Sequence, residues 1–501
     1  MKREDIIGCI ETYEASHAVE EYIVNGWHVW PLLKMIPCMK YLPLSAPPLP
    51  VSGGVAGLRP WLRTTSLYRV YKWLRRWKYR NKKNGACDYD SEHHDPHDVQ
   101  RDVVILTLSE RRVLLQGTLY EIYSDPLVEL LHKQGLSTLV WEQGEERYPR
   151  YSRSAWISRR MDAECRQFPL SSQFNDEPHW FGDYQKFTHE IMGRAVMWYE
   201  VATLIDVVTH QSFVFEKWLQ KTEARYLFAV CWYDPLVMAA TMAARRCGIK
   251  TIEIQHGSQG EWHFAYSAWL RAPSEGYEVV PDVFWCWGKT AVEELHEYNP
   301  AFFVKSSAVP GGNLWLNLWR ERVQRTTLTS SEKPAAPHKT ILVSLQLDVE
   351  PLLLDAIRAS PSSWRWLIRF HPAREKSSRV QEELMFKHAS HPGVELDKAN
   401  SLVLYELLGE SDVHVTAYSA CAIEALAFGV QTIIISSQGR MTFSSLIDQG
   451  LMMTADTSEK LIIEIEHAQR INPDKTPAIA SMFANGDDAI VAVQRIIKQE
   501  A

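Results

Sequence analysis

Short apolar runs alternate with helix-forming segments in the second half of the chain. The runs contain neither Gly nor Pro, which is typical of strands buried in a parallel sheet. They are residues 339–346, 364–370, 413–415 and 432–435. The Ala-rich stretch 420–428 predicts a helix that ends at Gly429. Strands that alternate with helices in this way predict a doubly wound α/β domain.

The same alternation occurs earlier in the chain. Residues 123–135 carry an Asp-Pro pair at 125–126, near their start, and end with Gly, which are start and stop signals of a helix. The other predicted helices are residues 180–221, 236–248 and 289–298, and the predicted strands are residues 102–108, 136–144, 225–232, 250–255 and 282–288. The first half therefore predicts a second parallel α/β domain.

A chain of 501 residues has room for two or three domains. Polar stretches rich in Pro, Ser and Gly separate the two alternating regions from each other and from the N-terminal part. We predict an N-terminal helical extension with linkers (1–100), a first Rossmann-like domain (101–312), an interdomain linker (313–338), a second Rossmann-like domain (339–485) and a C-terminal helix (486–501).

Polar residues follow the strand ends in the second half. His371 comes directly after the run 364–370, and Thr416 and Ser419 stand between the run 413–415 and the helix. Ligands of doubly wound sheets bind beyond the carboxyl ends of the strands, and a helix N-terminus offers free N–H groups to a phosphate. This half therefore predicts a nucleotide site.

Asp234 and His256 end the two strands of one predicted strand-helix-strand unit. Pro235 sets the start of the helix after Asp234, and His256 opens the turn His-Gly-Ser-Gln-Gly. The unit brings both side chains to the same edge of the sheet. Either side chain can serve as a general base there. The structural alternative is a turn in which His256 only hydrogen-bonds the backbone.

Two ordered patterns in the second half resemble a known family. They are Arg-Phe-His-Pro at 369–372 and Thr-x-x-Ser-x-x-x-x-Glu-Ala-Leu-x-x-Gly at 416–429. Together they resemble the C-terminal half of GT-B glycosyltransferases that build bacterial surface polysaccharides. The likeness is strongest to transferases of Kdo and sialic-acid type, with wall-teichoic glycerophosphotransferases as more distant relatives. It spans roughly residues 100–485.

The resemblance implies a GT-B fold, which is an α/β arrangement of two Rossmann-like domains facing across a cleft, with the C-terminal helix crossing back to the first domain. It implies that His371 and the Ser419 segment hold the phosphate of the donor nucleotide and that Glu424 binds its ribose. Arg369 and Arg374 would add positive charge. The other residues that we assign to substrate binding are Gln255, Gly257, Ser258, Ser344, Gln346 and Thr416.

The implied reaction moves a sugar from a donor of CMP-Kdo or CMP-sialic-acid type to a growing surface polysaccharide or lipid-linked glycan. No metal and no cofactor besides the nucleotide sugar are expected. The triplet Gln-His-Gly at 255–257 also recurs in these families, on the acceptor side of the active site. We assign catalysis to Asp234, as base or nucleophile, with His256 as its electrostatic partner.

Three alternatives share these features. A glycerophosphotransferase-like polymer synthase has a similar fold, and so does a sugar-nucleotide 2-epimerase. The epimerases carry a serine with two glycines and paired glutamates where this chain reads Ala-Tyr-Ser-Ala-Cys-Ala-Ile-Glu-Ala-Leu at 417–426, which counts against them. The third alternative is a non-catalytic scaffold at a membrane.

Charge and composition narrow the partners. A net charge of −7 and a pI near 6.2 do not indicate nucleic-acid binding. Residues 61–83 differ, because they hold nine Lys and Arg, no acid and several interleaved aromatics. This pattern predicts peripheral contact with an anionic membrane, the alternative being a solvated helix with one docked face.

Eight scattered cysteines without C-x-x-C spacing, and no apolar run long enough to span a bilayer, predict a cytoplasmic protein, peripheral at most at the inner face of the cell membrane.

Two weaker signals remain. His93, His94 and His97 lie among acidic residues and are metal-ligand types, although Pro96 and the polar composition favour a linker. Glu142-Gln143-Gly144 resembles the acidic pair and glycine with which sialyltransferase families place a general base, with glutamine replacing one acid.

Overall fold

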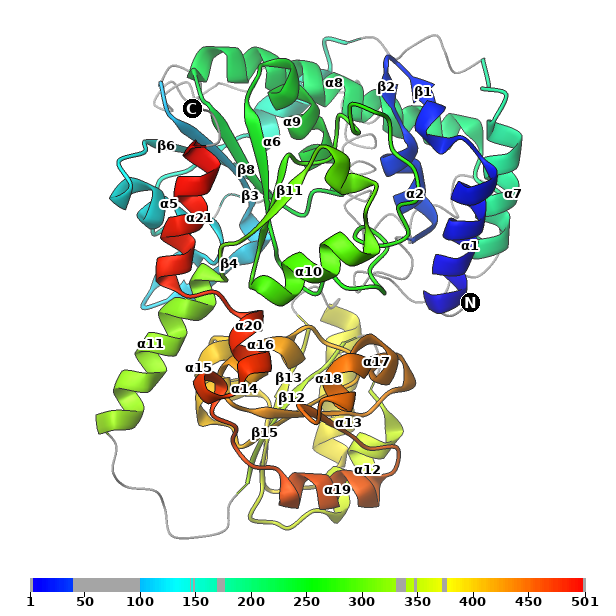
Figure 1. Cartoon of the computed structure of the whole chain (residues 1–501). Coiled ribbons are helices and arrows are strands. Elements are labelled where there is room, and N and C mark those ends of the chain that lie inside the picture. The colour runs from blue at the N-terminus through cyan, green and yellow to red at the C-terminus, as the bar shows by residue number, and fades with distance from the viewer. Residues whose placement is uncertain are drawn as a thin grey trace, which may run out of the picture. The chain divides into compact units, whose positions relative to one another are not determined.

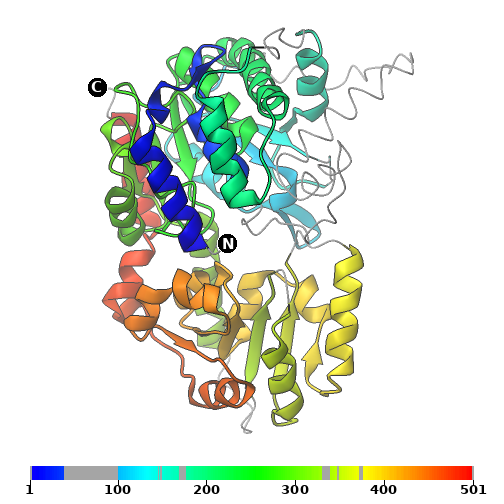
Figure 2. The ribbon, with the colours of Figure 1, turned by 90° about the vertical axis from the view of Figure 1, so that its right-hand side faces the viewer.

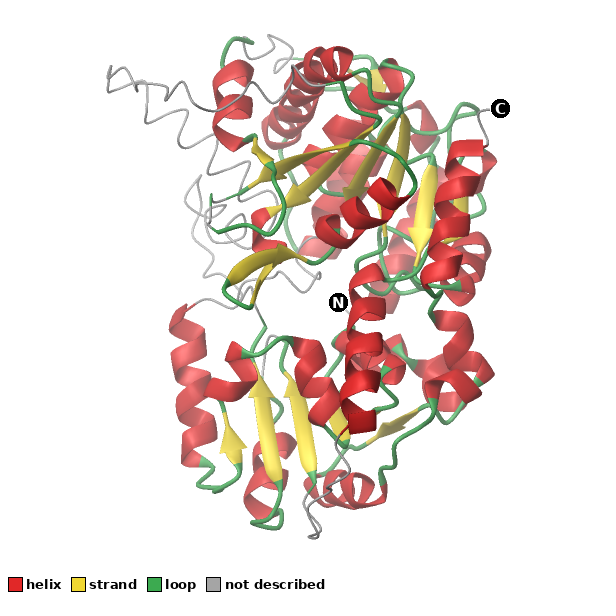
Figure 3. Cartoon of the chain, turned by 90° about the vertical axis from the view of Figure 1, so that its left-hand side faces the viewer, coloured by secondary structure: helices red, strands yellow, loops and turns green. Residues whose placement is uncertain are grey.

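The computed structural model describes residues 3–38, 100–144, 146, 149–168, 176–329, 339–346, 349–371 and 376–498. The chain divides into two compact units, which are residues 1–311 with 487–501 (unit 1) and residues 312–486 (unit 2) (Figure 1). Each unit is built around its own parallel sheet with helices on its faces, as Figure 3 shows. The predicted fold class, with two Rossmann-like parallel-sheet domains, is therefore confirmed.

The sheet of unit 2 has the strand order β14-β13-β12-β15-β16-β17, and all neighbouring strands are parallel. Counted along the chain, this is the 3-2-1-4-5-6 order of Rossmann folds, whose winding reverses between β12 and β15. The register pairs Ser344 with Arg369 on one side and with Thr416 on the other. These three residues therefore lie side by side at the carboxyl edge of the sheet.

The strands of unit 2 are β12 (Thr340–Ser344), β13 (Arg365–Arg369), β14 (Val394–Glu395), β15 (Val413–Thr416), β16 (Gln431–Ile434) and β17 (Met452–Thr454). Its helices are α11 (Leu314–Thr329), α12 (Pro351–Ala359), α13 (Lys376–His388), α14 (Asp397–Ser401), α15 (Leu404–Glu410), α16 (Cys421–Ala427), α17 (Ser437–Thr442), α18 (Ser444–Asp448), α19 (Ser458–His467) and α20 (Pro477–Met482).

The sheet of unit 1 has the order β11-β10-β9-β8-β3-β6-β7 and is also parallel throughout. Apart from the additional edge strand β11, the order is the same as in unit 2, and the winding reverses between β3 and β8. Its strands are β3 (Val103–Leu108), β6 (Thr138–Gln143), β7 (Ala155–Trp156), β8 (Tyr226–Val230), β9 (Lys250–Ile254), β10 (Val283–Cys286) and β11 (Ser307–Pro310).

The helices of unit 1 include the last helix of the chain. They are α1 (Arg3–Ser16), α2 (Trp30–Cys38), α5 (Ser124–Lys133), α6 (Ser158–Cys165), α7 (Phe181–Met192), α8 (Trp198–Thr222), α9 (Pro235–Arg246), α10 (Lys289–Tyr298) and α21 (Gly486–Lys498). A short ribbon of β1 (Ile23–Val24) and β2 (Trp27–His28) connects α1 to α2, and both helices lie against α7 (Figure 2).

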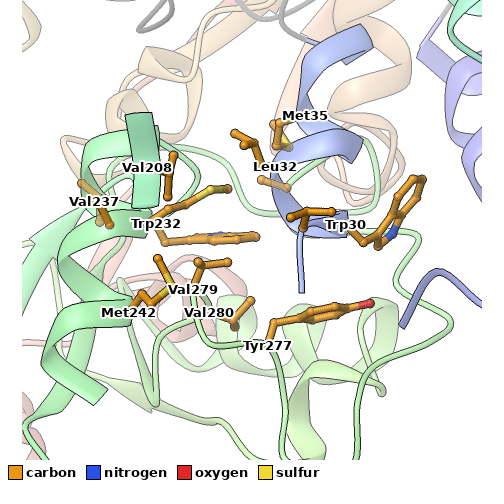
Figure 4. Close-up of a cluster of buried hydrophobic side chains, with 14 of the residues drawn as sticks. Trp30, Leu32, Met35, Val208, Trp232, Val237, Met242, Tyr277, Val279 and Val280 are labelled. Carbon is orange, nitrogen blue, oxygen red and sulfur yellow. The ribbon is translucent and has the colours of Figure 1, made fainter. Parts of the chain in front are cut away.

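The core of unit 1 joins the N-terminal segment to α8 and α9. α9 is buried along almost its whole length, and its alanines let the backbone of α8 approach closely. The indole of Trp232, which is fully buried, lies within this core. Figure 4 shows it among side chains from four parts of the chain, namely Trp30, Val208, Val237, Met242, Tyr277, Val279 and Val280. Burying each large apolar side chain contributes roughly 1.5–3 kcal/mol.

Lys34 on α2 is a cation inside this core. Its Nζ donates to Glu14 Oε1 at 3.3 Å, to the Ser267 carbonyl at 3.0 Å and to the Ala268 carbonyl at 2.6 Å. It also lies 3.6 Å from the centre of the Trp269 ring. Burial lowers the pKa of Lys34 to about 8, and Glu14 opposes that shift. Lys34 therefore ties the N-terminal helices to the body of unit 1.

Three elements fall outside the predicted pattern. β4 (Arg112–Leu115) and β5 (Thr118–Glu121) form an antiparallel hairpin, whose turn residues Gln116 and Gly117 both have positive φ. α6 lies in a stretch where the sequence gives no helical period, because only two of its eight residues are buried. α11 occupies much of the predicted linker and belongs to unit 2.

None of the helices in the described ranges is long and apolar enough to cross a bilayer. Residues 61–83, for which we predict membrane contact, lie outside those ranges.

Candidate functional site

Hydrogen bonds join hydroxyl and backbone groups at the carboxyl ends of β12 and β15, the two strands of unit 2 between which the winding of the sheet reverses. Thr416 Oγ1 donates to the Ser344 carbonyl at 2.7 Å and accepts the Ser419 N–H at 3.3 Å. Ser419 Oγ in turn accepts the N–H of Cys421, the first residue of α16, at 3.3 Å. The Gly439 backbone passes so close that a Cβ there would lie 1.9 Å from the Ala417 carbonyl oxygen. These contacts fix the segment between β15 and α16.

Arg369 and Glu424 form the charged part of this edge. Arg369 Nη1 donates to the carbonyls of Ala399 at 2.8 Å and Leu402 at 2.7 Å, which holds the guanidinium in place. The Glu424 carboxylate accepts a hydrogen bond from the Tyr405 hydroxyl. Burial raises the pKa of Glu424 to about 6, against the opposing effects of Tyr405 and the charge of Arg369. Glu424 is therefore mostly ionised at neutral pH.

Two further predicted residues follow the strand ends. Gln346 is buried, and its Oε1 has no hydrogen-bond partner among the described residues. His371 is partly buried and comes after Phe370, whose N–H donates to Asn400 Oδ1 at 3.0 Å. Ser344 and Arg369 are register partners, so Gln346 and His371 extend from neighbouring strands. Arg374 lies outside the described residues.

His414 is a buried histidine of this region that the sequence analysis did not single out. Its Nε2 lies 2.7 Å from Ser344 Oγ and its Nδ1 lies 3.0 Å from Thr432 Oγ1. Burial lowers the pKa of His414 to about 3, so the ring is neutral and joins three neighbouring strands. The apolar pattern of β15 carries no signal for such a link, because the partners come from other strands.

In unit 1, Gln255 organises the turn that carries His256. Its Nε2 donates to the Gly257 carbonyl at 2.8 Å, and its Oε1 accepts the Trp287 N–H at 2.6 Å. The Trp287 indole N–H donates to the Gln255 carbonyl at 2.9 Å. Gln255 therefore ties the end of β9 to the end of β10, and Ser258 lies partly buried in the same turn.

Asp234 has a clear structural task. It precedes α9 and is buried, and its Oδ1 accepts the Leu236 N–H at 2.9 Å, so it is the N-cap of that helix. In the described part of the chain, no hydrogen bond or ion pair joins Asp234 to His256. The structure places both at the carboxyl edge of the sheet, but in separate hydrogen-bonded groups.

His256 belongs to a cluster of titratable groups. Its Nε2 lies 3.3 Å from the Tyr233 hydroxyl. Its Nδ1 lies 3.9 Å from Glu253 Oε1 and has no hydrogen-bond partner within the described ranges. Glu253 is buried at the end of β9, where it accepts hydrogen bonds from the Tyr266 hydroxyl and, at 3.2 Å, from the Trp232 N–H. A glutamate in a short apolar strand was a signal for this cluster that the sequence analysis passed over.

Burial dominates the electrostatics of the cluster. It raises the pKa of Glu253 to about 8, so this carboxyl is mostly protonated at neutral pH. Burial, together with the positive charge of Arg111 and the nearby His263, lowers the pKa of His256 well below its usual value of 6.5. The imidazole of His256 is therefore neutral at neutral pH and can accept a proton.

Glu142 lies in a separate buried ion pair. Arg112 donates to both of its oxygens, from Nε at 2.8 Å and from Nη2 at 2.9 Å, and Ser154 and Arg150 add further contacts. These contacts lower the pKa of Glu142 against the effect of burial. Its carboxylate is occupied by partners from the hairpin and the neighbouring loop.

Across the described ranges, no group of three or more His, Cys, Asp or Glu side chains has the arrangement of a metal site. The candidate ligands His93, His94 and His97 lie outside those ranges.

Comparisons with known proteins give likeness at the level of structure. No protein-family model matches the chain, and no curated protein sequence matches it. The structure of a UDP-GlcNAc 2-epimerase from Neisseria meningitidis, bound to UDP-GlcNAc, is 13% identical over 79% of this chain and 99% of that chain, with a TM-score of 0.45. A UGT transferase from Siraitia grosvenorii in complex with UDP is 10% identical over 79% of this chain and 99% of that chain, with a TM-score of 0.43. A wall teichoic acid polymerase is 11% identical over 87% of this chain and 97% of that chain, with a TM-score of 0.41. Likeness at this level does not transfer an activity to this chain.

Proposed function

We propose that this protein is a GT-B type glycosyltransferase that moves a sugar from a nucleotide-activated donor to a surface polysaccharide or lipid-linked glycan. The observation that carries the proposal is the carboxyl edge of the unit 2 sheet. Arg369, Thr416, Ser419 and Glu424 meet there, where the winding of the sheet reverses. A cation and backbone N–H groups suit a phosphate, and a carboxylate suits ribose hydroxyls.

The donor lies on unit 2 in this proposal. His371 and the Ser419 segment hold its phosphate, Glu424 binds its ribose, and Ser344 and Gln346 contact the remainder. A donor of CMP-Kdo or CMP-sialic-acid type is favoured by the two sequence patterns that carry His371 and Ser419. No step in this scheme needs a metal ion, because fixed cations and N–H groups stabilise the leaving phosphate.

On unit 1 we propose His256 as the general base, with Asp234 in a supporting role. The sequence alone favours Asp234 for the role of base and His256 for the supporting role. Among the residues that the structure describes, the Nδ1 of the neutral imidazole has no hydrogen-bond partner, whereas the Asp234 carboxylate already caps α9. The imidazole takes the proton of the acceptor hydroxyl as that oxygen bonds to the anomeric carbon. The bond from this carbon to the donor phosphate oxygen breaks, and its electron pair leaves with the nucleotide.

A panel of CMP-, UDP- and GDP-sugars, each incubated with the protein and a glycan acceptor, tests the proposal by nucleotide release. We expect release with a CMP-sugar, dependent on the acceptor. Conversion of a UDP-sugar to its 2-epimer would identify an epimerase instead. Absence of both reactions, with no nucleotide binding, would favour a scaffold.

His371→Ala should weaken nucleotide affinity by about tenfold or more, because a charge-assisted contact to phosphate contributes roughly 1.5–3 kcal/mol. Calorimetry with the free nucleotide measures the effect. His388→Ala on α13 is the matched control, since His388 is exposed in the same unit. Equal affinities of the two variants, both folded, would remove His371 from the site.

We also propose that residues 61–83 hold the protein at an anionic membrane surface, near its lipid-linked acceptor, because of their nine cations and interleaved aromatics. Co-sedimentation should be stronger with anionic than with neutral vesicles. This difference should disappear when the segment is deleted, and its persistence would contradict the proposal.

A further inference from the structure

Buried polar atoms without partners gather along the carboxyl edge of the unit 1 sheet. Buried polar groups in proteins are nearly always hydrogen-bonded, so a cluster of unpaired ones indicates a site for a polar ligand. In the described part of the chain, these atoms include Arg111 Nη1, Glu121 Oε1, Gln143 Oε1, Glu253 Oε2, His256 Nδ1 and Gln259 Nε2. They follow the ends of several neighbouring strands, including β3, β6 and β9.

Arg111 supplies the fixed charge of this edge. It follows β3, and its guanidinium carbon lies 5.5 Å from the centre of the Tyr123 ring. The Tyr123 hydroxyl donates to the His256 carbonyl at 3.2 Å, so Arg111 and the turn of His256 both contact the same tyrosine. The neighbouring Arg112 is paired with Glu142, whereas the structure records no ion pair for Arg111 in the described ranges.

The carboxyl groups of Glu121 and Glu253 interact with the charge of Arg111, and burial raises the pKa of both. From β9 comes Glu253, which is mostly protonated at neutral pH, and the following loop adds His263 and Tyr266. Tyr233 follows β8 and keeps its proton because burial raises its pKa. Glu121 at the end of β5 faces the backbone, because its Oε2 accepts the N–H groups of Tyr123 and Ser124. Burial raises the pKa of Glu121, against the opposing effects of its hydrogen bond from the Ser124 backbone and of the charge of Arg111.

We propose that Arg111 binds an oxyanion, a phosphate or a carboxylate, that the acceptor carries close to its reacting hydroxyl, next to the neutral imidazole of His256. The identification of the carrier as the acceptor rests on the proposed function, whereas the binding of the anion does not. A guanidinium binds either group through parallel N–H donors, and Gln259 Nε2 is a further donor of the cluster that has no partner among the described residues.

The bound anion also changes the basicity of His256. The positive charge of Arg111 makes His256 harder to protonate, and an anion placed between them offsets that charge. An anionic acceptor therefore increases the basicity of His256, and a neutral acceptor does not. An anionic acceptor is therefore favoured twice, because it binds to Arg111 and because it makes His256 a stronger base for the proton transfer.

Calorimetric titration with inorganic phosphate and with acetate tests the site. We expect at least one of them to bind, and Arg111→Gln to weaken that binding by about tenfold or more. Arg101→Gln is the matched control and should leave affinity unchanged, because Arg101 is a partly buried arginine that precedes the amino end of the same strand, β3, where its Nη1 donates to the Gln100 carbonyl at 2.8 Å. Arg111→Lys, which keeps the charge, should retain part of the affinity. All titrations use the His371→Ala background, so that phosphate binding on unit 2 does not contribute.

Preference for phosphate or for acetate identifies the group that the acceptor carries. Equal binding of both anions by the Arg111→Gln and Arg101→Gln proteins, or no binding of either anion, would overturn the proposal. These outcomes are distinct from failure of the proposed function, which the nucleotide panel detects through unit 2.

A second measurement reads His256 directly. Its imidazole signal, assigned by its loss in His256→Gln, is followed by NMR from about pH 8 down to the lowest pH at which the protein stays folded, with and without sulfate, which stays an anion over that range. We expect sulfate to raise the pKa of His256 in the unsubstituted protein but not in Arg111→Gln. An unchanged pKa in the unsubstituted protein would contradict the coupling.

Discussion

Turnover should fall by about 10²–10⁴-fold when His256 is replaced by glutamine, which is the typical contribution of a general base. Nucleotide affinity should stay unchanged, since we assign the nucleotide to unit 2. Steady-state nucleotide release gives the turnover and calorimetry gives the affinity. The unsubstituted protein should lose activity only as the pH falls well below 6.5, because the base must be neutral and burial and Arg111 keep the pKa of His256 low.

Asp234→Asn is the comparison that assigns the base. An asparagine oxygen can still accept the Leu236 N–H, so the cap of α9 and the fold are retained. We expect a smaller loss of turnover than for His256→Gln. A loss on the order of a thousandfold in Asp234→Asn, with His256→Gln nearly active, would return the role of base to Asp234.

Lys34→Met should lower the free energy of unfolding of unit 1 by about 3–5 kcal/mol. The substitution removes the cation that donates to Glu14 and to the carbonyls of Ser267 and Ala268, and it leaves the Glu14 carboxylate buried without its counter-ion. Denaturant unfolding followed by tryptophan fluorescence measures the loss.

Two variants control this prediction. Lys34→Met with Glu14→Gln should recover part of the loss, because a neutral amide is cheaper to bury than an unpaired carboxylate. Lys186→Met removes an exposed pair with Asp183 (2.7 Å) and should change stability by at most about 1 kcal/mol. A Lys34→Met protein as stable as Lys186→Met would show that the buried pair contributes little.

The sequence by itself determined the fold class and the order of the main elements. Apolar runs without Gly or Pro marked β3, β8, β9, β12, β13 and β15, because a strand buried on both faces must be apolar along its length. Asp234-Pro235 marked the start of α9, because capping and proline geometry act within a few residues. The sequence also indicated candidate residues such as Arg369, Thr416 and Ser419, because these polar residues stand at or directly after the ends of apolar runs.

Only the tertiary structure decided which of these residues share partners. Arg111 comes from a segment far in the chain from Glu253 and His256, and the protonation of Glu253 and the neutrality of His256 follow from the burial and the charge that folding places around them. The buried pair of Lys34 and Glu14 also depends on tertiary structure, because Lys34 donates to the Ser267 and Ala268 carbonyls of a turn that is distant in the chain. Local patterns report burial and backbone conformation, whereas the charge state of a buried group depends on the neighbours that folding brings to it.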